Sequence, residues 1–265
     1  MAAIRATLAE RELDLVDLRS QFAAFEGRTY PSGQSAEGKT QINVNSGAEI
    51  LKFVAATKAD LGRLVDCSGR VMYSSVETLR PGPLYTLGIN PGLDPSGLDC
   101  ASVGASLDEL PTSHKNSYRE CWDRGALAGS DPLQRNFRWL VEQLGFDLDA
   151  VCSSNIVFPR SRTASEAKKF VGACWPVHER ILSIVQPKYI LAFGKLPIRT
   201  LQKRFQNVQL LDSFPANHQR WTCQVFSGSF QGRPITVLGV PHLGRRYSYG
   251  PPLPMDVQRL ARFIG

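Results

Sequence analysis

The sequence predicts an α/β fold in which a parallel sheet is covered by helices on both faces. Short apolar runs typical of buried strands alternate along the chain with amphipathic stretches typical of helices. Each strand-like run stops at a glycine or a proline, residues that end strands and begin tight turns. Strands joined by helices form parallel sheets, and the carboxyl ends of those strands share one edge, where ligands bind.

Four apolar runs are predicted to form the strands, at residues 84–87, 151–158, 189–193 and 235–240. The first stops at Gly88-Ile89-Asn90-Pro91-Gly92. Glycine permits unusual backbone angles there, and proline cannot continue strand pairing, so we predict a tight turn at the carboxyl end of a buried strand. Asn-Pro-Gly alone is ordinary turn chemistry, and it gains significance only if the other strands also end in polar side chains.

Amphipathic stretches predict helices around these strands. They lie at residues 4–25, 48–65, 132–145, 164–185, from about 197 onward, and 255–264. Pro176 is expected to kink the fourth helix or to begin it anew. Residues 27–47 predict a loop, and residues 94–131 form a long connection, which inside a compact domain is usually functional or disordered.

The domain organisation predicted from this pattern has two parts. We interpret residues 1–80 as an amino-terminal helical extension packed on the main domain, and residues 81–265 as that domain. No stretch approaches the roughly 20 apolar residues of a membrane helix, and charge follows the first residues too soon for a signal peptide. We therefore expect a cytoplasmic protein with no membrane partner, and nothing in the sequence demands more than a monomer.

Charge and cysteine content narrow the partners and cofactors. The 265 residues carry a formal net charge of +7, which permits a polyanion such as DNA as a partner but does not require one. Six cysteines lie far apart, without a CxxC pair or the Cys/His spacing of zinc sites. We predict reduced thiols that serve mostly in packing, and no metal.

A polar side chain stands at or just beyond the end of each predicted strand. These side chains are Asn90, Asn155, Lys195 and His242. A single parallel sheet would bring all four to the same edge. Purely structural roles predict no such coincidence, so this edge is the predicted functional site.

Several of these segments resemble motifs of the uracil-DNA glycosylase superfamily. Gly88-Ile89-Asn90-Pro91-Gly92-Leu93 resembles the first motif of the mismatch-specific and single-strand-selective branches, and Asn136-Phe137-Arg138-Trp139 resembles a segment that follows it. Residues 154–157 and 174–195 are similar to the middle of the iron–sulfur branches, and Pro241-His242 stands in place of the last motif. The resemblance runs from about residue 82 onward, in the family's order. It implies a three-layer α/β/α sandwich with a central, mainly parallel four-stranded sheet.

The resemblance implies a monofunctional DNA glycosylase that flips out a base and hydrolyses its N-glycosidic bond, leaving an abasic site. Carried over by position, it implies that Asn90 holds the attacking water and that Asn155 binds the polar edge of the flipped base. His242 would stabilise the departing base, because a hydrogen bond to the base oxygen acts where negative charge develops. Gly88, Ile89 and Gly92 would border the base.

Other residues are candidates for contacts with the base and with DNA. The aromatic residue that usually stacks on the base is absent, and Tyr118 or Trp122 is the candidate replacement. Flipping requires a wedge and phosphate contacts. Leu243 is the candidate wedge, and Lys195, Arg245 and Arg246 are the candidate phosphate ligands.

The sequence also departs from the family's pattern. The last motif is His-Leu-Gly-Arg-Arg in place of His-Pro-Ser. Cys174 matches one iron–sulfur ligand, but Phe158 stands where another cysteine would be, and the amino-terminal CxxC is missing. We predict no iron–sulfur cluster and no other cofactor. Gly92 replaces a tyrosine that, in the uracil-specific branch, blocks substituents on carbon 5 of the base.

Four functions remain open at this point. The open side at Gly92 and the insertion at 94–131 favour a 5-modified cytosine, such as the glucosylated hydroxymethylcytosine of phage DNA, and hence an antiviral enzyme. The second possibility is a uracil-excising repair enzyme, because an asparagine amide can face either a uracil or a cytosine edge. The third is a DNA-binding protein on a glycosylase scaffold without catalytic activity, which the altered last motif supports. A nucleotide-handling enzyme is weakly indicated by Gly194-Lys195, since the full phosphate-loop pattern is absent.

Overall fold

The computed structural model describes residues 47–92, 101–122, 126–217, 220–244 and 254–265. The chain divides into two compact units, Met1–Gln41 and Ile42–Gly265. The helix predicted at 4–25 lies outside the described residues, as does nearly all of the loop predicted at 27–47. The boundary predicted near residue 80 falls inside the second unit, so the first described helix belongs with the sheet.

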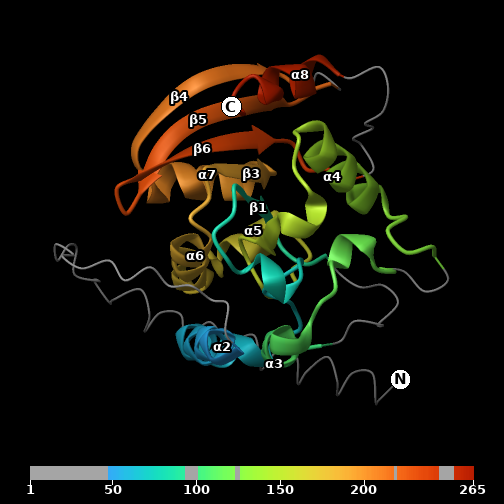
Figure 1. Ribbon diagram of the computed structural model, residues 1–265, viewed down its shortest axis with the longest axis vertical. Coiled ribbons are helices and arrows are strands. Elements are labelled where there is room, and N and C mark those ends of the chain that lie inside the picture. The colour runs from blue at the N-terminus through green and yellow to red at the C-terminus, as the bar shows by residue number, and fades with distance from the viewer. Residues whose placement is uncertain (1–46, 93–100, 123–125, 218–219, 245–253) are drawn as a thin grey trace. The chain divides into compact units, whose positions relative to one another are not determined.

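The sheet has six strands in the order β2-β1-β3-β6-β5-β4 (Figure 1). The strands are β1 Leu84–Gly88, β2 Cys152–Asn155, β3 Tyr189–Phe193, β4 Gln206–Pro215, β5 Thr222–Phe230 and β6 Arg233–Val240. The first four in this order are parallel, and they include all four predicted strands. Strands β5 and β4 continue the sheet in the antiparallel sense. The predicted four-stranded sheet is therefore corrected to a mixed sheet of six.

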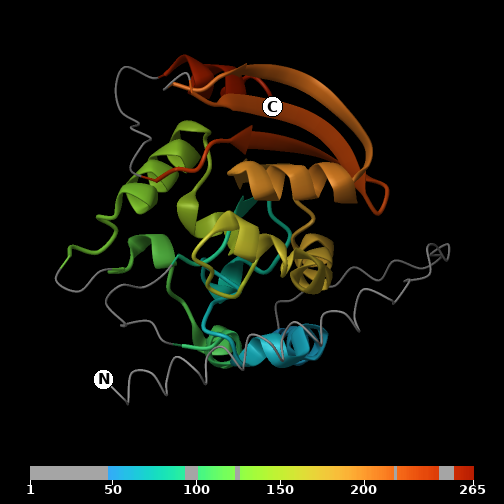
Figure 2. The same cartoon turned by 180° about the vertical axis from the view of Figure 1, so that it is seen from behind.

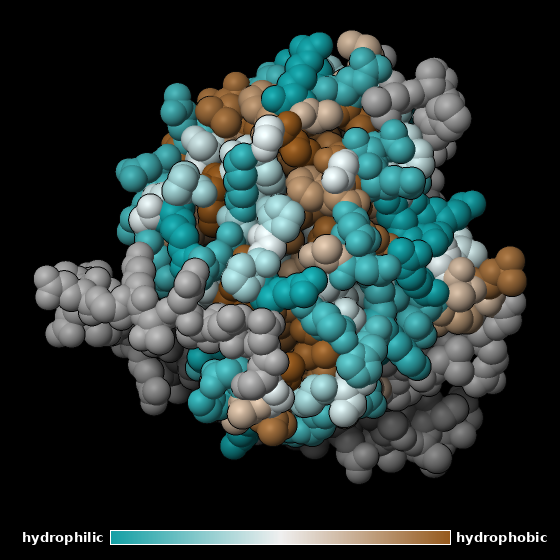
Figure 3. Space-filling view, in the orientation of Figure 1, coloured by the Kyte–Doolittle hydropathy of each residue, from teal (hydrophilic) through white to brown (hydrophobic). Residues whose placement is uncertain are grey.

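Neither β4 nor β5 was predicted from the sequence. Strand β5 has buried residues at alternating positions, but polar residues and a glycine interrupt its apolar residues, so no apolar run marks it. Strand β4 is the edge strand, and nearly all of its residues are exposed or half-buried, including the apolar Val208, Leu210 and Leu211. A strand exposed on both faces has no alternation of apolar and polar residues to detect. Hydrophobic residues accordingly reach the surface where β4 and β5 lie in the view of Figure 3.

Helices cover both faces of the sheet, because side chains along each central strand alternate between two hydrophobic clusters. Tyr85 and Leu87 of β1 point into one cluster and Leu84 into the other. The first cluster contains residues of α2 Gly47–Leu61, α3 Val103–Glu109, α5 Ala164–Lys168, α6 Val171–Val185 and α7 Lys195–Arg204. The second contains residues of α4 Pro132–Gln143 and α8 Met255–Ala261. Figures 1 and 2 show the two groups from opposite sides. The protein is an α/β sandwich, as predicted.

Two predicted segments differ in detail from the structure. The helix predicted at 164–185 breaks at residues 169–170 into α5 and α6, and Pro176 lies inside α6 rather than at the break. Thr163 caps α5 by accepting a hydrogen bond from the backbone N–H of Glu166, so α5 begins as a separate element. The long connection at 94–131 contains α3 and two short 3-10 helices, Leu110–Thr112 and Ser117–Arg119.

A buried histidine joins three elements beneath the carboxyl edge of the sheet. His178 of α6 is fully buried, its Nδ1 lies 2.8 Å from the Tyr85 hydroxyl, and its Nε2 lies 3.2 Å from the Ile156 carbonyl oxygen. A carbonyl can only accept, so Nε2 carries the proton and Nδ1 accepts from Tyr85. Burial lowers the pKa of His178 from 6.5 to about 4, against the opposing effect of the Ile156 carbonyl. His178 is therefore neutral at physiological pH, and it fixes the segment that follows β2.

This burial predicts a dependence of stability on pH. Between about pH 6.5 and pH 4 the unfolded chain binds a proton at His178, whereas the folded chain does not. As the pH is lowered through this range, the free energy of unfolding therefore decreases, by up to about 3 kcal/mol from this group. A His178→Gln variant keeps a donor and an acceptor but does not titrate. We expect it to be less stable than the wild type at pH 7, and this difference to shrink towards pH 4. Urea unfolding at several pH values measures this, and a constant difference would contradict the assigned protonation state.

Candidate functional site

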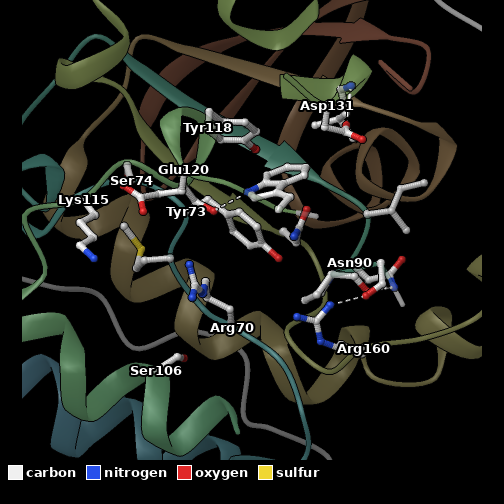
Figure 4. Close-up of a pocket in the computed structure, with 18 of the residues that line it drawn as sticks. Arg70, Tyr73, Ser74, Asn90, Ser106, Lys115, Tyr118, Glu120, Asp131 and Arg160 are labelled. Atoms are coloured by element: carbon white, nitrogen blue, oxygen red, sulfur yellow. Dashed lines mark hydrogen bonds between the residues drawn. The ribbon is translucent and has the colours of Figure 1, made fainter. Parts of the chain in front are cut away.

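A cavity of about 710 Å³ lies at the carboxyl edge of the parallel strands (Figure 4). Asn90, Asn155 and His242, three of the four polar side chains predicted to gather at this edge, line it. Further walls come from the connection at 101–122 and from the segment after β2, which supplies Arg160. The fourth predicted residue, Lys195, does not line the cavity.

The strand pairing explains why distant residues meet here. Gly88 at the end of β1 pairs with Asn155 at the end of β2, and Phe193 at the end of β3 pairs with Val240 at the end of β6. Beyond β2 the chain stays beside β1, because the backbone N–H of Ile156 donates to the Gly88 carbonyl over 2.9 Å. The four parallel strands therefore end together, and the residues just beyond them surround the same space.

Asn90 is held in one orientation by two backbone carbonyls. Its Nδ2 donates to the carbonyl oxygen of Pro91 at 2.7 Å and to that of Ser161 at 3.0 Å. Because both partners are acceptors, the amide cannot be reversed without losing both bonds. Among the described residues nothing donates to the Asn90 Oδ1, so this atom can accept a hydrogen bond from a water or a ligand in the cavity. An amide has no basicity at neutral pH, so Asn90 can orient a water but cannot deprotonate it.

Asn155 is almost completely buried, with 6% of its surface exposed, yet its side chain lines the cavity. Its amide makes no hydrogen bond within the described part of the chain. Because the side chain lines the cavity, a ligand bound there can supply hydrogen-bond partners for the amide. Gly88 makes this position possible: a Cβ there would lie 2.1 Å from the Asn155 Oδ1 and 2.8 Å from the Phe193 ring. Gly88 therefore acts by leaving space and does not itself line the cavity.

His242 is prepared to donate a hydrogen bond from Nε2. The backbone N–H of Gly244 donates to its Nδ1 over 3.2 Å, so Nδ1 carries a lone pair. The His242 side chain is exposed at the cavity, but the protein atoms around its ring restrict its contact with water and thereby lower its pKa. The negative charge of Asp131 opposes this shift. The neutral imidazole with its proton on Nε2 is the form favoured at neutral pH.

Asp131 is a cavity residue that the sequence did not identify as functional. It lines the cavity and caps α4: its Oδ1 accepts from the backbone N–H of Leu133 at 2.7 Å, and Gln134 completes a capping box. The Asn136 amide of α4 donates to the Leu243 carbonyl at 2.9 Å, which fixes the helix to the loop of His242. Asp-Pro is typical of the start of a helix, so the sequence indicates a capping role for Asp131. It gives no sign that the same side chain also lines the cavity.

Aromatic side chains form one wall. Tyr118, the predicted base-stacking residue, lines the cavity but is buried, and Phe137 stacks on its ring at 3.9 Å between centroids. Trp122 and Tyr73 are half-buried and also line the cavity, and Figure 4 shows Tyr73 pointing into it. Phe193 completes the wall. Tyr73 lies outside every predicted element, and Phe193 was predicted only as a strand residue.

Two further residues were predicted to border the base. Ile89 and Gly92 both line the cavity. A Cβ at Gly92 would meet nothing within 4 Å, so the cavity is open beside this residue. Across the cavity from Asn90, Figure 4 shows the polar Ser74 and Lys115, and Arg70, Ser106 and Glu109 also line it.

Among the predicted DNA contacts, the wedge role of Leu243 is corrected. Leu243 is fully buried in the second hydrophobic cluster, and its carbonyl is bonded to Asn136, so in this conformation it is a core residue and not a wedge. Lys195 is exposed, and its Nζ lies 4.5 Å from the centre of the Trp221 ring. Arg245 and Arg246 lie outside the described residues.

The described residues were also compared with the requirements of a metal site and of a membrane-spanning helix. They contain no group of three or more His, Cys, Asp or Glu side chains placed to hold a metal ion. Cys174 is buried in the first cluster, and burial raises the pKa of its thiol to about 12. Over the same residues, every helix is too short or too polar to span a bilayer.

The electrostatic link between Asp131 and His242 can be tested directly. Asparagine caps helices as well as aspartate, so Asp131→Asn removes the charge and keeps the start of α4. We expect the pKa of His242 to fall further, because the only identified influence that favours its charged form is lost. NMR titration of the His242 imidazole in the wild type and in the variant measures this. An unchanged or raised His242 pKa would show that Asp131 does not act on it.

Comparisons with known proteins add no assignment to this cavity. No protein-family model matches the chain, and no curated protein is significantly similar to it. The chemical interpretation therefore depends on the geometry described above and on the resemblance of the motifs.

Proposed function

We propose that this protein is a monofunctional DNA glycosylase that hydrolyses the N-glycosidic bond of a flipped-out pyrimidine. One observation carries the proposal: Asn90, Asn155 and His242, far apart in sequence, line a single cavity. Each presents the polar atom that this reaction needs. The motif resemblance gives the same three residues the same three roles.

The hydrolysis can be derived from these atoms. Asn90 Oδ1 accepts a hydrogen bond from a water and directs it at the sugar carbon C1′. As the bond between C1′ and the base nitrogen breaks, its electron pair leaves with the base, and His242 Nε2–H donates to the oxygen that gains negative charge. The water oxygen bonds to C1′, its proton passes to solvent or to the base, and an abasic site and a free base result. Asp131 adds a negative charge near a sugar that becomes electron-poor.

The shape and charge of the site support an extruded base in DNA as the substrate. A base inside a duplex cannot reach a recessed cavity, so the nucleotide must rotate out of the helix. The aromatic wall of Tyr73 and Trp122 offers apolar surface to a base. Arg160 and Arg162 at the cavity, together with a net charge of +7, suit a phosphate backbone.

The size and polarity of the cavity favour a pyrimidine with a large substituent. A volume of about 710 Å³ lies within the range of pockets that enclose drug-sized ligands and exceeds what one pyrimidine ring fills. Ser106, Glu109 and Lys115 would offer hydrogen bonds to hydroxyl groups. We therefore propose a 5-modified cytosine, such as glucosylated hydroxymethylcytosine of phage DNA, as the substrate and antiviral defence as the role. Excision of uracil is the alternative.

Replacing the catalytic side chains should slow excision strongly and leave DNA binding intact. We expect Asn90→Ala and His242→Ala each to slow the formation of alkali-labile abasic sites by about 100-fold or more. The assay uses DNA containing uracil and, separately, phage DNA with glucosylated cytosines. Gln209→Ala, which truncates an exposed amide on β4, is the matched control.

Two outcomes would contradict this assignment. Full activity in both variants would show that the reaction occurs elsewhere. If the wild type binds DNA but forms no abasic site on any substrate, the protein is a DNA-binding protein on a glycosylase scaffold.

The substrate preference can be tested at Gly92. A tyrosine there would enter open space and occupy the side of the cavity assigned to the substituent, whereas Gly92→Ala adds a methyl group that meets nothing within 4 Å. We expect Gly92→Tyr to lose excision of the glucosylated base, and Gly92→Ala to keep it. Relative excision rates on the two DNA substrates measure this. A Gly92→Tyr variant that removes the bulky base at the wild-type rate would disprove the assigned side.

A further inference from the structure

An exposed tryptophan stands at the same edge of the sheet as the cavity. Trp221 immediately precedes β5, which runs antiparallel to β6, so the start of β5 lies where the parallel strands end. The tryptophan keeps 37% of its surface exposed. It is the only aromatic residue among the exposed large hydrophobic side chains of the described residues. It does not line the cavity, but it precedes the strand that pairs with β6, which leads to the cavity residue His242.

A lysine from a neighbouring element lies over the tryptophan ring. Lys195 begins α7 directly after β3, and its Nζ lies 4.5 Å from the Trp221 centroid. Strand β3 pairs with β6, the strand that leads to His242. Lys195, Trp221 and His242 therefore come from three adjacent strands of the sheet and share one edge.

The chemistry of this pair matches that of a single-stranded or locally opened nucleic acid. An exposed indole stacks on any base, because every base presents a π face, and a neighbouring ammonium pairs with phosphate. The cation–π contact keeps the lysine beside the ring before any ligand arrives. Leu243, the apolar residue predicted for the opening of the duplex, is buried and cannot make this contact in the present conformation.

We propose that Trp221 and Lys195 form a DNA-binding site beside the cavity, in which Trp221 stacks on a base left unpaired next to the extruded nucleotide and Lys195 binds a phosphate. This inference rests on the proposed function for the identity of the ligand. It adds a stacking residue just before β5, outside the motifs that resemble the glycosylase family. It also gives Lys195 a role outside the cavity.

The test measures the affinity for a DNA duplex that carries a stable abasic analogue, so that no chemistry is required. Fluorescence anisotropy at several salt concentrations gives the dissociation constant and its salt dependence. We expect Trp221→Ala to weaken binding by about 10-fold and Trp221→Phe to keep most of the affinity, since phenylalanine retains a π face. We expect Lys195→Gln to reduce the slope of affinity against salt by about one.

Matched controls separate this site from general charge and surface effects. Lys52→Gln removes the same charge on α2, where Lys52 pairs with Glu49, and should leave the salt slope unchanged. Leu210→Ala removes a comparably exposed apolar side chain from β4 and should leave the affinity unchanged. Circular dichroism establishes that each variant is folded.

The outcomes distinguish this inference from the proposed function. Wild-type affinity in Trp221→Ala, with wild-type excision intact, would overturn the stacking site and leave the glycosylase assignment standing. Equal losses in Trp221→Ala and Trp221→Phe would also overturn stacking, because both variants lack the indole but only one lacks an aromatic ring. A wild-type protein that does not bind the abasic duplex would overturn the site, whatever its activity.

Discussion

The site depends on the close approach of three strands at the end of β1, where there is no room for a side chain. A single methyl group at Gly88 would collide with the Asn155 amide and with the Phe193 ring. The Asn155 backbone is held in β2 and the Phe193 ring lies in the packed second cluster, so such a methyl group would displace both side chains from their positions. The glycine thus allows a polar amide and an aromatic ring to share the floor of one cavity. Dense packing in protein interiors makes such a requirement strict.

Backbone groups, more than pairs of side chains, fix the polar atoms of the cavity. Carbonyl oxygens orient Asn90, and a backbone N–H fixes the tautomer of His242. The cap of α4 and its bond to the Leu243 carbonyl hold Asp131 in place. Backbone partners cannot rotate away as long side chains can, so these atoms are positioned before a ligand arrives. Such preorganisation is a main source of catalytic power in enzymes that stabilise developing charge.

The sequence predicted those parts of the site that depend on strand ends. Strands β1, β3 and β6 are short apolar runs that stop at Gly88, Gly194 and Pro241. Strand β2 is shorter than the predicted run at 151–158 and ends at Asn155, and Asn90, Asn155 and His242 all line the cavity at this edge. The edge strand β4 escaped prediction because its residues are exposed on both faces. The local sequence pattern indicated one role for a residue and could not indicate a second role that depends on tertiary packing.

Three residues illustrate this limit in physical terms. Asp131 has the pattern of a helix cap, and its proximity to His242 arises only from the packing of α4 against the last strand's loop. Leu243 follows the histidine as a wedge would, but the second cluster buries it. Lys195 follows β3 as predicted, yet it turns to Trp221, a residue that lies 26 positions further along the chain. Tertiary packing decides each of these cases, and no local pattern records it.

The unanchored amide of Asn155 has a consequence for how this cavity could change its selectivity. No hydrogen-bond partner among the described residues fixes the orientation of the amide. A rotation of about 180° about χ2 therefore exchanges its oxygen and its nitrogen without breaking a hydrogen bond to these residues. The same asparagine can therefore serve ring edges with opposite donor and acceptor order. Discrimination between nucleobases then passes to the surrounding walls, and a lineage could acquire a new preference by altering those walls while this asparagine stays in place.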